Sequence, residues 1–299
     1  MTTPPFGRVL TAMVTPLTVD GAVDLARTAE LADRLVGQGN DGLVVSGTTG
    51  EAPTTTREEK AELLRAVVDA VGGRAHVVAG VGTNDTAHSL DLARDAEKAG
   101  ATGLLSVTPY YSKPPQSGII AHTRALADST ALPVMLYDIP GRTGVPLRHE
   151  TLLELARHPQ VVAVKDAKDD LAATSRLLAD LARDGSDLAV YSGTDSLNLP
   201  LLSIGAVGVV SVVSHIVTSQ VVELLHAHST GDVARAASVN LQLQPVYTGL
   251  FRNQGVILTK AALALLGFPV GPVRLPLVGA TLEEIAVLTA DLTAAGVLA

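Results

Sequence analysis

Residues 161–168 read VVAVKDAK, and they set the expectation for the fold of the whole chain. The three valines and one alanine form a short apolar run, which is typical of a strand covered on both faces, as in a parallel sheet. Lys165 stands at the carboxyl end of this run. A strand rarely carries an ammonium group into a buried position without a function, because desolvating the charge is costly. Lys165 is therefore either a solvent-facing residue just past the strand, or a desolvated amine with a lowered pKa that can form a Schiff base with a carbonyl compound.

Similar apolar runs recur along the chain and alternate with amphipathic helical patterns. The strand-like runs begin near Arg8, Gly42, His76, Gly103, Pro133, Val161, Leu188 and Ala206. The helical patterns include Leu25–Gln38, Arg57–Ala70, Leu90–Ala99 and Leu171–Arg183. Thr56 and Glu59 predict a capping box at the start of the second of these helices. Eight strand–helix units in series, with no glycine-rich linker between them, predict an α/β protein that folds as a (β/α)8 TIM barrel.

An open doubly wound sheet is the alternative architecture. It would need a phosphate-binding fingerprint after an early strand, and Gly80-Val81-Gly82 has no third glycine in place. After the eighth strand the pattern stays helical, with helices expected at Ser219–Ser229, Val233–Phe251, Val256–Leu266 and Leu282–Gly296. A barrel needs one helix after its last strand, so three helices are surplus. We therefore expect a catalytic barrel over residues 1–230 and a C-terminal helical extension over residues 231–299.

Composition excludes several classes of partner. The chain has 299 residues, a net charge of −8 and no basic run, which argues against nucleic acid and anionic membrane surfaces. No apolar run is long enough to span a bilayer, and the start, MTTPPFGRVL, lacks a signal-peptide core. With no cysteine in the chain, a cytoplasmic location is expected. The histidines are scattered, so no metal site is predicted.

Polar residues gather where the predicted strands end, which is where the active site of such a barrel lies. Ser46–Glu51 (SGTTGE) follows the second strand, Thr108–Tyr111 (TPYY) the fourth, and Tyr137–Arg142 (YDIPGR) the fifth. The glycines of the first loop would let amides and hydroxyls approach a carboxylate, although the same residues also suit an ordinary tight turn. Hydroxyls, Arg142 and Lys165 around one barrel mouth predict proton shuttling beside a Schiff base, with the guanidinium binding an anionic substrate.

Five motifs make the chain resemble the dihydrodipicolinate synthase, or 4-hydroxy-tetrahydrodipicolinate synthase, family. They are GTTGE at 47–51, TPYY at 108–111, YDIPGRTG at 137–144, VKDA at 164–167 and SGTD at 192–195. The match runs in order over essentially the whole chain and is most similar to the actinobacterial branch. The wider family of pyruvate-dependent class I aldolases includes N-acetylneuraminate lyase and the 2-keto-3-deoxy sugar acid aldolases. Arg142 in its GRTG context favours the synthase.

The resemblance implies an activity and a set of site residues. Lys165 would form an imine with pyruvate, which would then condense with L-aspartate 4-semialdehyde in diaminopimelate and lysine biosynthesis, without cofactor or metal. Thr48, Tyr137 and Tyr111 would relay protons, with Tyr111 reaching in from a neighbouring subunit of a homotetramer. The residues implied to bind substrate are Thr49, Arg142, Gly193 and Val210.

Two other functions fit parts of the sequence. A pyruvate-dependent sugar acid aldolase would account for every motif except Arg142, and a catalytically silent scaffold barrel would retain the whole set without use. Three features depart from the family pattern: Thr194 replaces a usual acidic residue, Asp138 stands where many members have asparagine, and residues 251–260 (FRNQGVILTK) are unlike the enterobacterial type. The sequence assigns no role to these positions.

Overall fold

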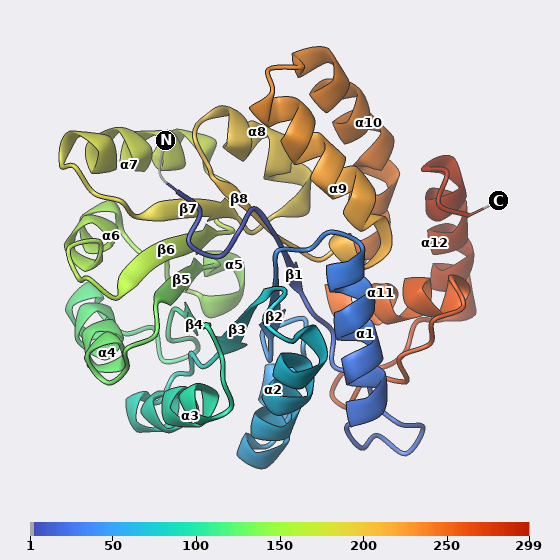
Figure 1. Ribbon diagram of the computed structural model, residues 1–299, viewed down its shortest axis with the longest axis horizontal. Coiled ribbons are helices and arrows are strands. Elements are labelled where there is room, and N and C mark those ends of the chain that lie inside the picture. The colour runs from blue at the N-terminus through green and yellow to red at the C-terminus, as the bar shows by residue number, and fades with distance from the viewer. Residues whose placement is uncertain (1–2, 299) are drawn as a thin grey trace.

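A closed barrel of eight parallel strands, joined in chain order, forms the centre of the molecule (Figure 1). The computed structural model describes residues 3–298. The strands are β1 (Val9–Ala12), β2 (Gly42–Val45), β3 (His76–Gly80), β4 (Gly103–Val107), β5 (Val134–Asp138), β6 (Val161–Asp166), β7 (Ala189–Ser192) and β8 (Gly208–Ser211). Val9 of β1 pairs with Val209 of β8, which closes the sheet. The predicted TIM barrel is confirmed, and the open doubly wound sheet is wrong.

Helices surround the barrel between successive strands. They are α1 (Leu25–Gly37), α2 (Arg57–Val71), α3 (Thr86–Lys98), α4 (Gln116–Asp128), α5 (Pro140–Thr143), α6 (His149–Leu155), α7 (Leu171–Arg183) and α8 (Asn198–Ser203). Of these, α1, α2, α3 and α7 each begin after a residue whose side chain caps the first turn. The predicted capping box of Thr56 and Glu59 is present at α2. Helix α3 begins at Thr86 rather than Leu90, because Asp85 accepts hydrogen bonds from the amides that follow it.

The interior of the barrel is filled by alternate residues of each strand, since successive side chains of a strand point to opposite faces. One buried cluster contains Ala163 of β6, Met135 of β5 and Ala189 of β7. Val164, the neighbour of Ala163, belongs instead to the layer between the sheet and the helices. Two residues beyond Ala163, Lys165 therefore faces the barrel interior at its carboxyl end.

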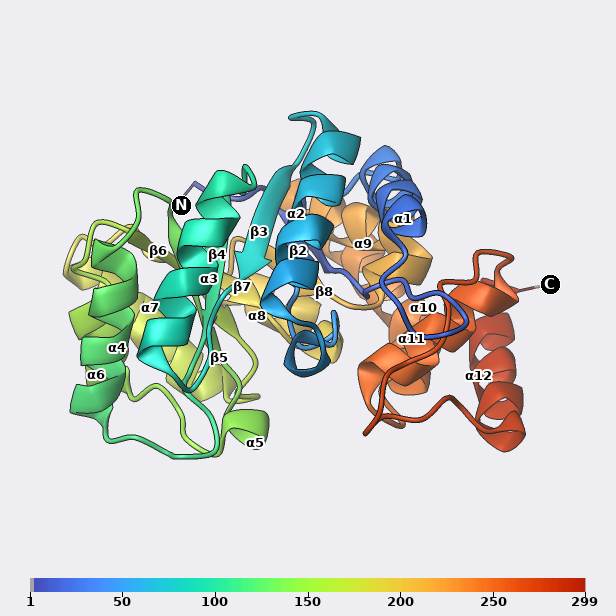
Figure 2. The same cartoon turned by 90° about the horizontal axis from the view of Figure 1, so that it is seen from below.

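Four helices follow the eighth strand. Helix α9 (Ser214–Ser229) covers the barrel. Val217 has a non-helical backbone conformation, so a short first turn precedes a kink and the long part of the helix begins close to the predicted Ser219. Helices α10 (Val233–Leu250), α11 (Gly255–Leu265) and α12 (Leu282–Ala294) lie to one side of the barrel (Figures 1 and 2). They share an apolar cluster with α9. The division of the chain near residue 230 stays a prediction.

The segment between α11 and α12, residues 266–281, returns to the barrel, and we call it the C-terminal strap. The amide of Leu17 donates to the carbonyl of Val270 at 3.0 Å, close to the loop that follows β1. A side chain at Gly271 would collide with the carbonyl of Leu17, so only glycine permits this approach. Over residues 3–298, no helix combines the length and the apolar character needed to cross a membrane.

Candidate active site

Lys165 faces the interior of the barrel, in the layer of side chains nearest the carboxyl ends of the strands. It is the β6 partner of Tyr137 on β5 and of Tyr191 on β7. Its side chain is only 5% exposed, and its Nζ lies 4.3 Å from the centre of the Tyr137 ring. The structure therefore decides between the two interpretations of Lys165: it is a buried amine and not a solvent-facing residue.

Burial changes the acidity of Lys165. Desolvation lowers its pKa to about 8, the negative charge of Asp195 raises the pKa, and the positive charge of Arg142 lowers it further. A lysine with an ordinary pKa is almost entirely protonated at neutral pH, whereas roughly one molecule in ten carries the free amine at pH 7 when the pKa is 8. Only the free amine attacks a carbonyl, so this environment prepares Lys165 as a nucleophile.

Tyr137 provides a protonated hydroxyl beside that amine. Desolvation raises the pKa of Tyr137 to about 12, although Arg142 and a hydrogen bond with Thr48 act in the opposite direction. The phenol therefore keeps its proton at physiological pH. A hydroxyl that stays neutral can donate one hydrogen bond while accepting another, which suits it to relay protons rather than to act as a phenolate.

A cavity of about 390 Å³ opens above this layer, lined by Thr48, Tyr137 and Arg142 among others. Arg142 lies on the short helix α5, at the opposite end of the barrel from the N-terminal segment of the chain (Figure 2). Its side chain is exposed, and no carboxylate of residues 3–298 forms an ion pair with it. A guanidinium that faces a cavity without a protein partner is suited to bind a carboxylate from solution.

Three other predicted binding residues lie close to the site in different ways. Gly193 is adjacent to Lys165, since an added Cβ would lie 2.9 Å from its Cγ. Val210 is buried in the barrel interior. Thr49 is partly exposed, in the turn that follows Thr48, and does not line the cavity. Gly193 thus leaves room for Lys165, and Val210 contributes packing.

The two adjacent tyrosines after β4 behave differently. Tyr110 is half-buried and lines the cavity. Tyr111 has a left-handed backbone conformation, with φ of 69°, and its side chain is 88% exposed. A large aromatic side chain is seldom left this exposed without a partner surface. Within its own chain, Tyr111 is not brought to Lys165.

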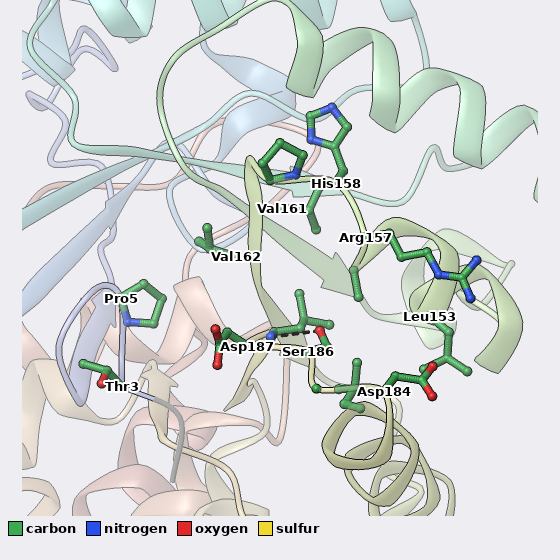
Figure 3. Close-up of a pocket in the computed structure, with 15 residues that line it drawn as sticks. Thr3, Pro5, Leu153, Arg157, His158, Val161, Val162, Asp184, Ser186 and Asp187 are labelled. Carbon is green, nitrogen blue, oxygen red and sulfur yellow. Dashed lines mark hydrogen bonds between the residues drawn. The ribbon is translucent and has the colours of Figure 1, made fainter.

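A second cavity, of about 730 Å³, lies at the other end of the barrel (Figure 3). Its lining includes Val161 and Val162, at the amino end of β6, and Asp187, which precedes β7. None of the predicted site residues lines this cavity. Because catalytic groups in these barrels lie at the carboxyl ends of the strands, the smaller cavity is the candidate active site.

Comparison with known proteins identifies the family. The model of the dihydrodipicolinate synthetase family matches residues 5–295. This chain belongs to that family. A 4-hydroxy-tetrahydrodipicolinate synthase of Acidothermus cellulolyticus is 63% identical over 292 residues, covering 98% of this chain and 93% of that relative. A second one, from Streptomyces coelicolor, is 61% identical over 293 residues and covers 98% of this chain and 96% of the relative.

A solved structure of the dihydrodipicolinate synthase of Thermotoga maritima superimposes with a TM-score of 0.95 at 38% identity, covering 99% of this chain and all of the other. These findings confirm the predicted family and the similarity to actinobacterial members. They also confirm the assignment of the chain as an enzyme of the synthase type. They leave the roles of individual residues as predictions.

Asp195 is a buried carboxylate whose charge acts on Lys165, and the sequence assigned it no role. It is buried, and its Oδ2 accepts hydrogen bonds from the amides of Val212 at 2.8 Å and Val213 at 3.1 Å. These bonds hold the carboxylate in place, and its negative charge partly offsets the effect of desolvation on the pKa of Lys165. The available signal was an acidic residue at the end of the seventh strand, in the SGTD motif.

The departures from the family pattern have local partners. Asp138 is buried, and desolvation raises its pKa. The Nζ of Lys168 lies 3.5 Å from Asp138 and 3.1 Å from Asp166, so one ammonium serves both carboxylates. Thr194 donates from its hydroxyl to Asp169 at 2.8 Å. Asp138 and Thr194 are therefore held by contacts with neighbouring residues, and neither of them lines the cavity.

The lowered pKa of Lys165 predicts a pH dependence for imine formation. The initial rate with pyruvate should rise roughly tenfold between pH 6 and pH 7 and level off above about pH 9, because the free amine accumulates as pH rises through the pKa of about 8. Mass spectrometry after a short cyanoborohydride quench measures this rate. A rate that still rises tenfold per unit at pH 9.5 would show that the amine has an ordinary pKa.

Proposed function

We propose that the chain is a 4-hydroxy-tetrahydrodipicolinate synthase that condenses pyruvate with L-aspartate 4-semialdehyde. The observation that carries this proposal is the buried amine of Lys165 against the ring of Tyr137, which lines a cavity together with Arg142, whose guanidinium has no ion-pair partner among residues 3–298. One group supplies covalent catalysis on a keto acid, and the other can bind the carboxylate of a second substrate. The proposed reaction serves diaminopimelate and lysine biosynthesis, and we propose a cytoplasmic enzyme.

The proposed chemistry begins with Lys165. Its free amine adds to the ketone carbon of pyruvate, and the oxygen leaves as water to give an imine. The protonated imine withdraws electrons, so a methyl proton is lost and an enamine forms. The enamine carbon then attacks the aldehyde carbon of the semialdehyde, and the aldehyde oxygen takes up a proton. Attack by the amino group of the semialdehyde at the imine carbon closes the ring and releases the amine of Lys165.

Tyr137 and Thr48 supply the proton path in this proposal. Their hydroxyls interact, and both line the cavity beside Lys165. Protons must be delivered to the departing water and to the aldehyde oxygen, and they must be taken from the methyl group. Neutral hydroxyls in a desolvated cavity can carry protons in both directions without holding a charge. No metal or other cofactor has a role in these steps.

A direct assay tests the function against the sugar acid aldolase alternative. The purified protein should turn over pyruvate with L-aspartate 4-semialdehyde, and the product is detected by its reduction with a coupled reductase. With 2-keto-3-deoxy sugar acids, release of pyruvate should be at least about a hundredfold slower. Those substrates carry a carboxylate only next to the ketone, and they lack the second carboxylate that Arg142 would bind. Faster cleavage of a sugar acid would support the alternative, and no imine with pyruvate would support a silent barrel.

We also propose that the active enzyme is a homotetramer in which Tyr111 completes the site of a neighbouring subunit. The support is the exposure of Tyr111 and its left-handed backbone, which hold a large side chain away from its own chain. In this arrangement the phenol would extend the path formed by Thr48 and Tyr137.

Subunit mixing tests this proposal. Tyr111→Phe and Lys165→Ala homo-oligomers should each have little activity. Mixed oligomers should recover activity, because a site with an intact Lys165 can then receive Tyr111 from its neighbour. The measurement is turnover after the two variants are unfolded together and refolded, compared with each variant treated alone. No recovery in mixtures that mass spectrometry shows to be hetero-oligomeric would mean that each site is built from one chain.

A further inference from the structure

The loop that follows β2, residues 46–56, is tied to the C-terminal extension by a buried ion pair. Glu51 comes directly after the turn that contains Thr48 and Thr49. Its Oε1 lies 2.7 Å from the Nζ of Lys260, near the middle of α11, and the two residues are 3% and 5% exposed. The same ammonium donates to the carbonyl of Pro272 in the C-terminal strap at 2.5 Å. One buried cation therefore joins the loop, α11 and the strap.

Arg274 of the C-terminal strap makes a second set of contacts with the same region. Its amide donates to Oε2 of Glu51 at 2.8 Å. Its guanidinium donates to the carbonyl of Thr54 at 2.7 Å and to the carbonyl of Gly21 at 2.8 Å. It also pairs with both carboxylate oxygens of Glu59, at 2.6 and 2.8 Å. Both oxygens of Glu51 are thus held by groups from the last part of the chain.

The backbone of the loop needs such support. Ser46 and Glu51 both have positive φ, 57° and 55°, which is uncommon for residues other than glycine and persists where the surroundings hold it. Thr15 contributes a further contact by donating to the carbonyl of Gly50 at 2.6 Å. The two uncommon conformations lie on either side of Thr48 and Thr49, so their geometry decides where the two threonines lie.

We propose that Glu51, Lys260 and Arg274 are positioning residues, which hold Thr49 in place for binding the carboxylate of the keto acid and hold Thr48 in place beside Tyr137. The inference rests on the proposed function, since it concerns the binding of pyruvate. It gives the C-terminal extension a part in substrate binding. It also assigns a role to residues 251–260, the segment that differs from the enterobacterial type. Neither Lys260 nor Arg274 lines the cavity, so their influence passes through Glu51 and the loop.

The effect of breaking the pair follows from its burial. Removing the ammonium alone leaves a buried carboxylate without its counter-charge, which is strongly unfavourable. Glu51 must then take up a proton or move towards water, and either change releases the loop. Thr48 and Thr49 shift with it, while Lys165, on a different strand of the barrel, keeps its position. The affinity for pyruvate should therefore fall more than the reactivity of the amine.

The test is the concentration of pyruvate that gives half-maximal cyanoborohydride trapping at Lys165. For Lys260→Met this concentration should rise about tenfold, because a shift of about 1 Å in a binding group has effects of that size or larger. The maximal extent of trapping should stay near the wild-type level. Thermal unfolding is measured in parallel, since a residue with a purely structural role lowers the unfolding midpoint and leaves the pyruvate dependence unchanged.

A double variant and a matched control sharpen the result. Glu51→Gln/Lys260→Met removes both charges and keeps an acceptor for the amide of Arg274, so its half-maximal concentration should return to within about threefold of wild type. Arg252→Ala is the control. Arg252 also forms an ion pair within the C-terminal extension, with Asp291 at 2.9 Å, but it does not contact the loop. It should leave the pyruvate dependence unchanged.

Each outcome has one interpretation. A raised concentration for Lys260→Met, recovery in the double variant and no change for Arg252→Ala support the proposal. An unchanged concentration in Lys260→Met, or an equal rise with Arg252→Ala, overturns it while the proposed function stands. If Lys260→Met does not fold, Glu51→Gln alone must raise the concentration, or the proposal fails. If pyruvate labels none of these proteins, including the wild type, the proposed function fails and the inference fails with it.

Discussion

Replacement of Lys165 by alanine should abolish turnover and leave a folded protein. The variant cannot form an imine with pyruvate, so the rate should fall by at least about four orders of magnitude, as for other residues that form the covalent intermediate. The fold should tolerate the change, because it removes a charge that is costly to bury. Steady-state assays with both substrates, together with thermal unfolding, measure the two effects.

Chemical trapping identifies the nucleophile independently of turnover. Pyruvate with cyanoborohydride should label the wild type on Lys165 alone, and the Lys165→Ala variant not at all. Lys113→Ala is the control, because Lys113 lies in the same loop as Tyr111 and lacks the buried environment of Lys165. That variant should be labelled like the wild type. A label that peptide mapping places on Lys113 or Lys168 would show that another amine forms the imine.

The fold could be predicted from the sequence because its determinants are local. Each strand is a short apolar run, and the alternation of strands and helices leaves few topologies once parallel pairing is assumed. The short first turn of α9, before the kink at Val217, was not predicted, and it has a tertiary cause. Its first residues include His215, whose Nε2 accepts from the amide of Val14 at 3.0 Å. Burial lowers the pKa of this histidine to about 4, and no local pattern marks a polar residue with this role.

The candidate site also contains residues that the sequence could predict and residues that it could not. Lys165 and Tyr137 could be assigned to the barrel mouth, because both stand at the carboxyl ends of predicted strands. Contacts between segments far apart in the chain could not be predicted. No sequence pattern near Glu51 indicates that it pairs with Lys260. The position of the Asp195 carboxylate likewise depends on backbone amides that follow β8. Both contacts depend on three-dimensional proximity, which the hydrophobic pattern of the sequence does not encode.

Arg142→Ala should weaken the productive use of L-aspartate 4-semialdehyde far more than that of pyruvate. Loss of a charge-assisted pair with a substrate carboxylate costs about 2–4 kcal/mol, or roughly 30- to 1000-fold in kcat/KM for the semialdehyde. The pyruvate concentration for half-maximal trapping should change little. Arg142→Lys should fall between the wild type and the alanine variant, because an ammonium keeps the charge and loses the bidentate geometry. Arg148→Ala, an exposed arginine a short distance along the chain, should match the wild type.

The same variant should also change the pH dependence of imine formation, which separates an electrostatic role from a structural one. The charge of Arg142 lowers the pKa of Lys165. Without it the amine should hold its proton more strongly, so the midpoint of the rate profile should move to higher pH. A misfolded loop would weaken both substrates and leave this midpoint in place. If Arg142→Ala weakened pyruvate as much as the semialdehyde and the midpoint did not move, Arg142 would be structural and the sugar acid aldolase alternative would gain support. If only the semialdehyde were weakened and the midpoint rose, one guanidinium would be binding the second substrate and also helping to keep Lys165 deprotonated.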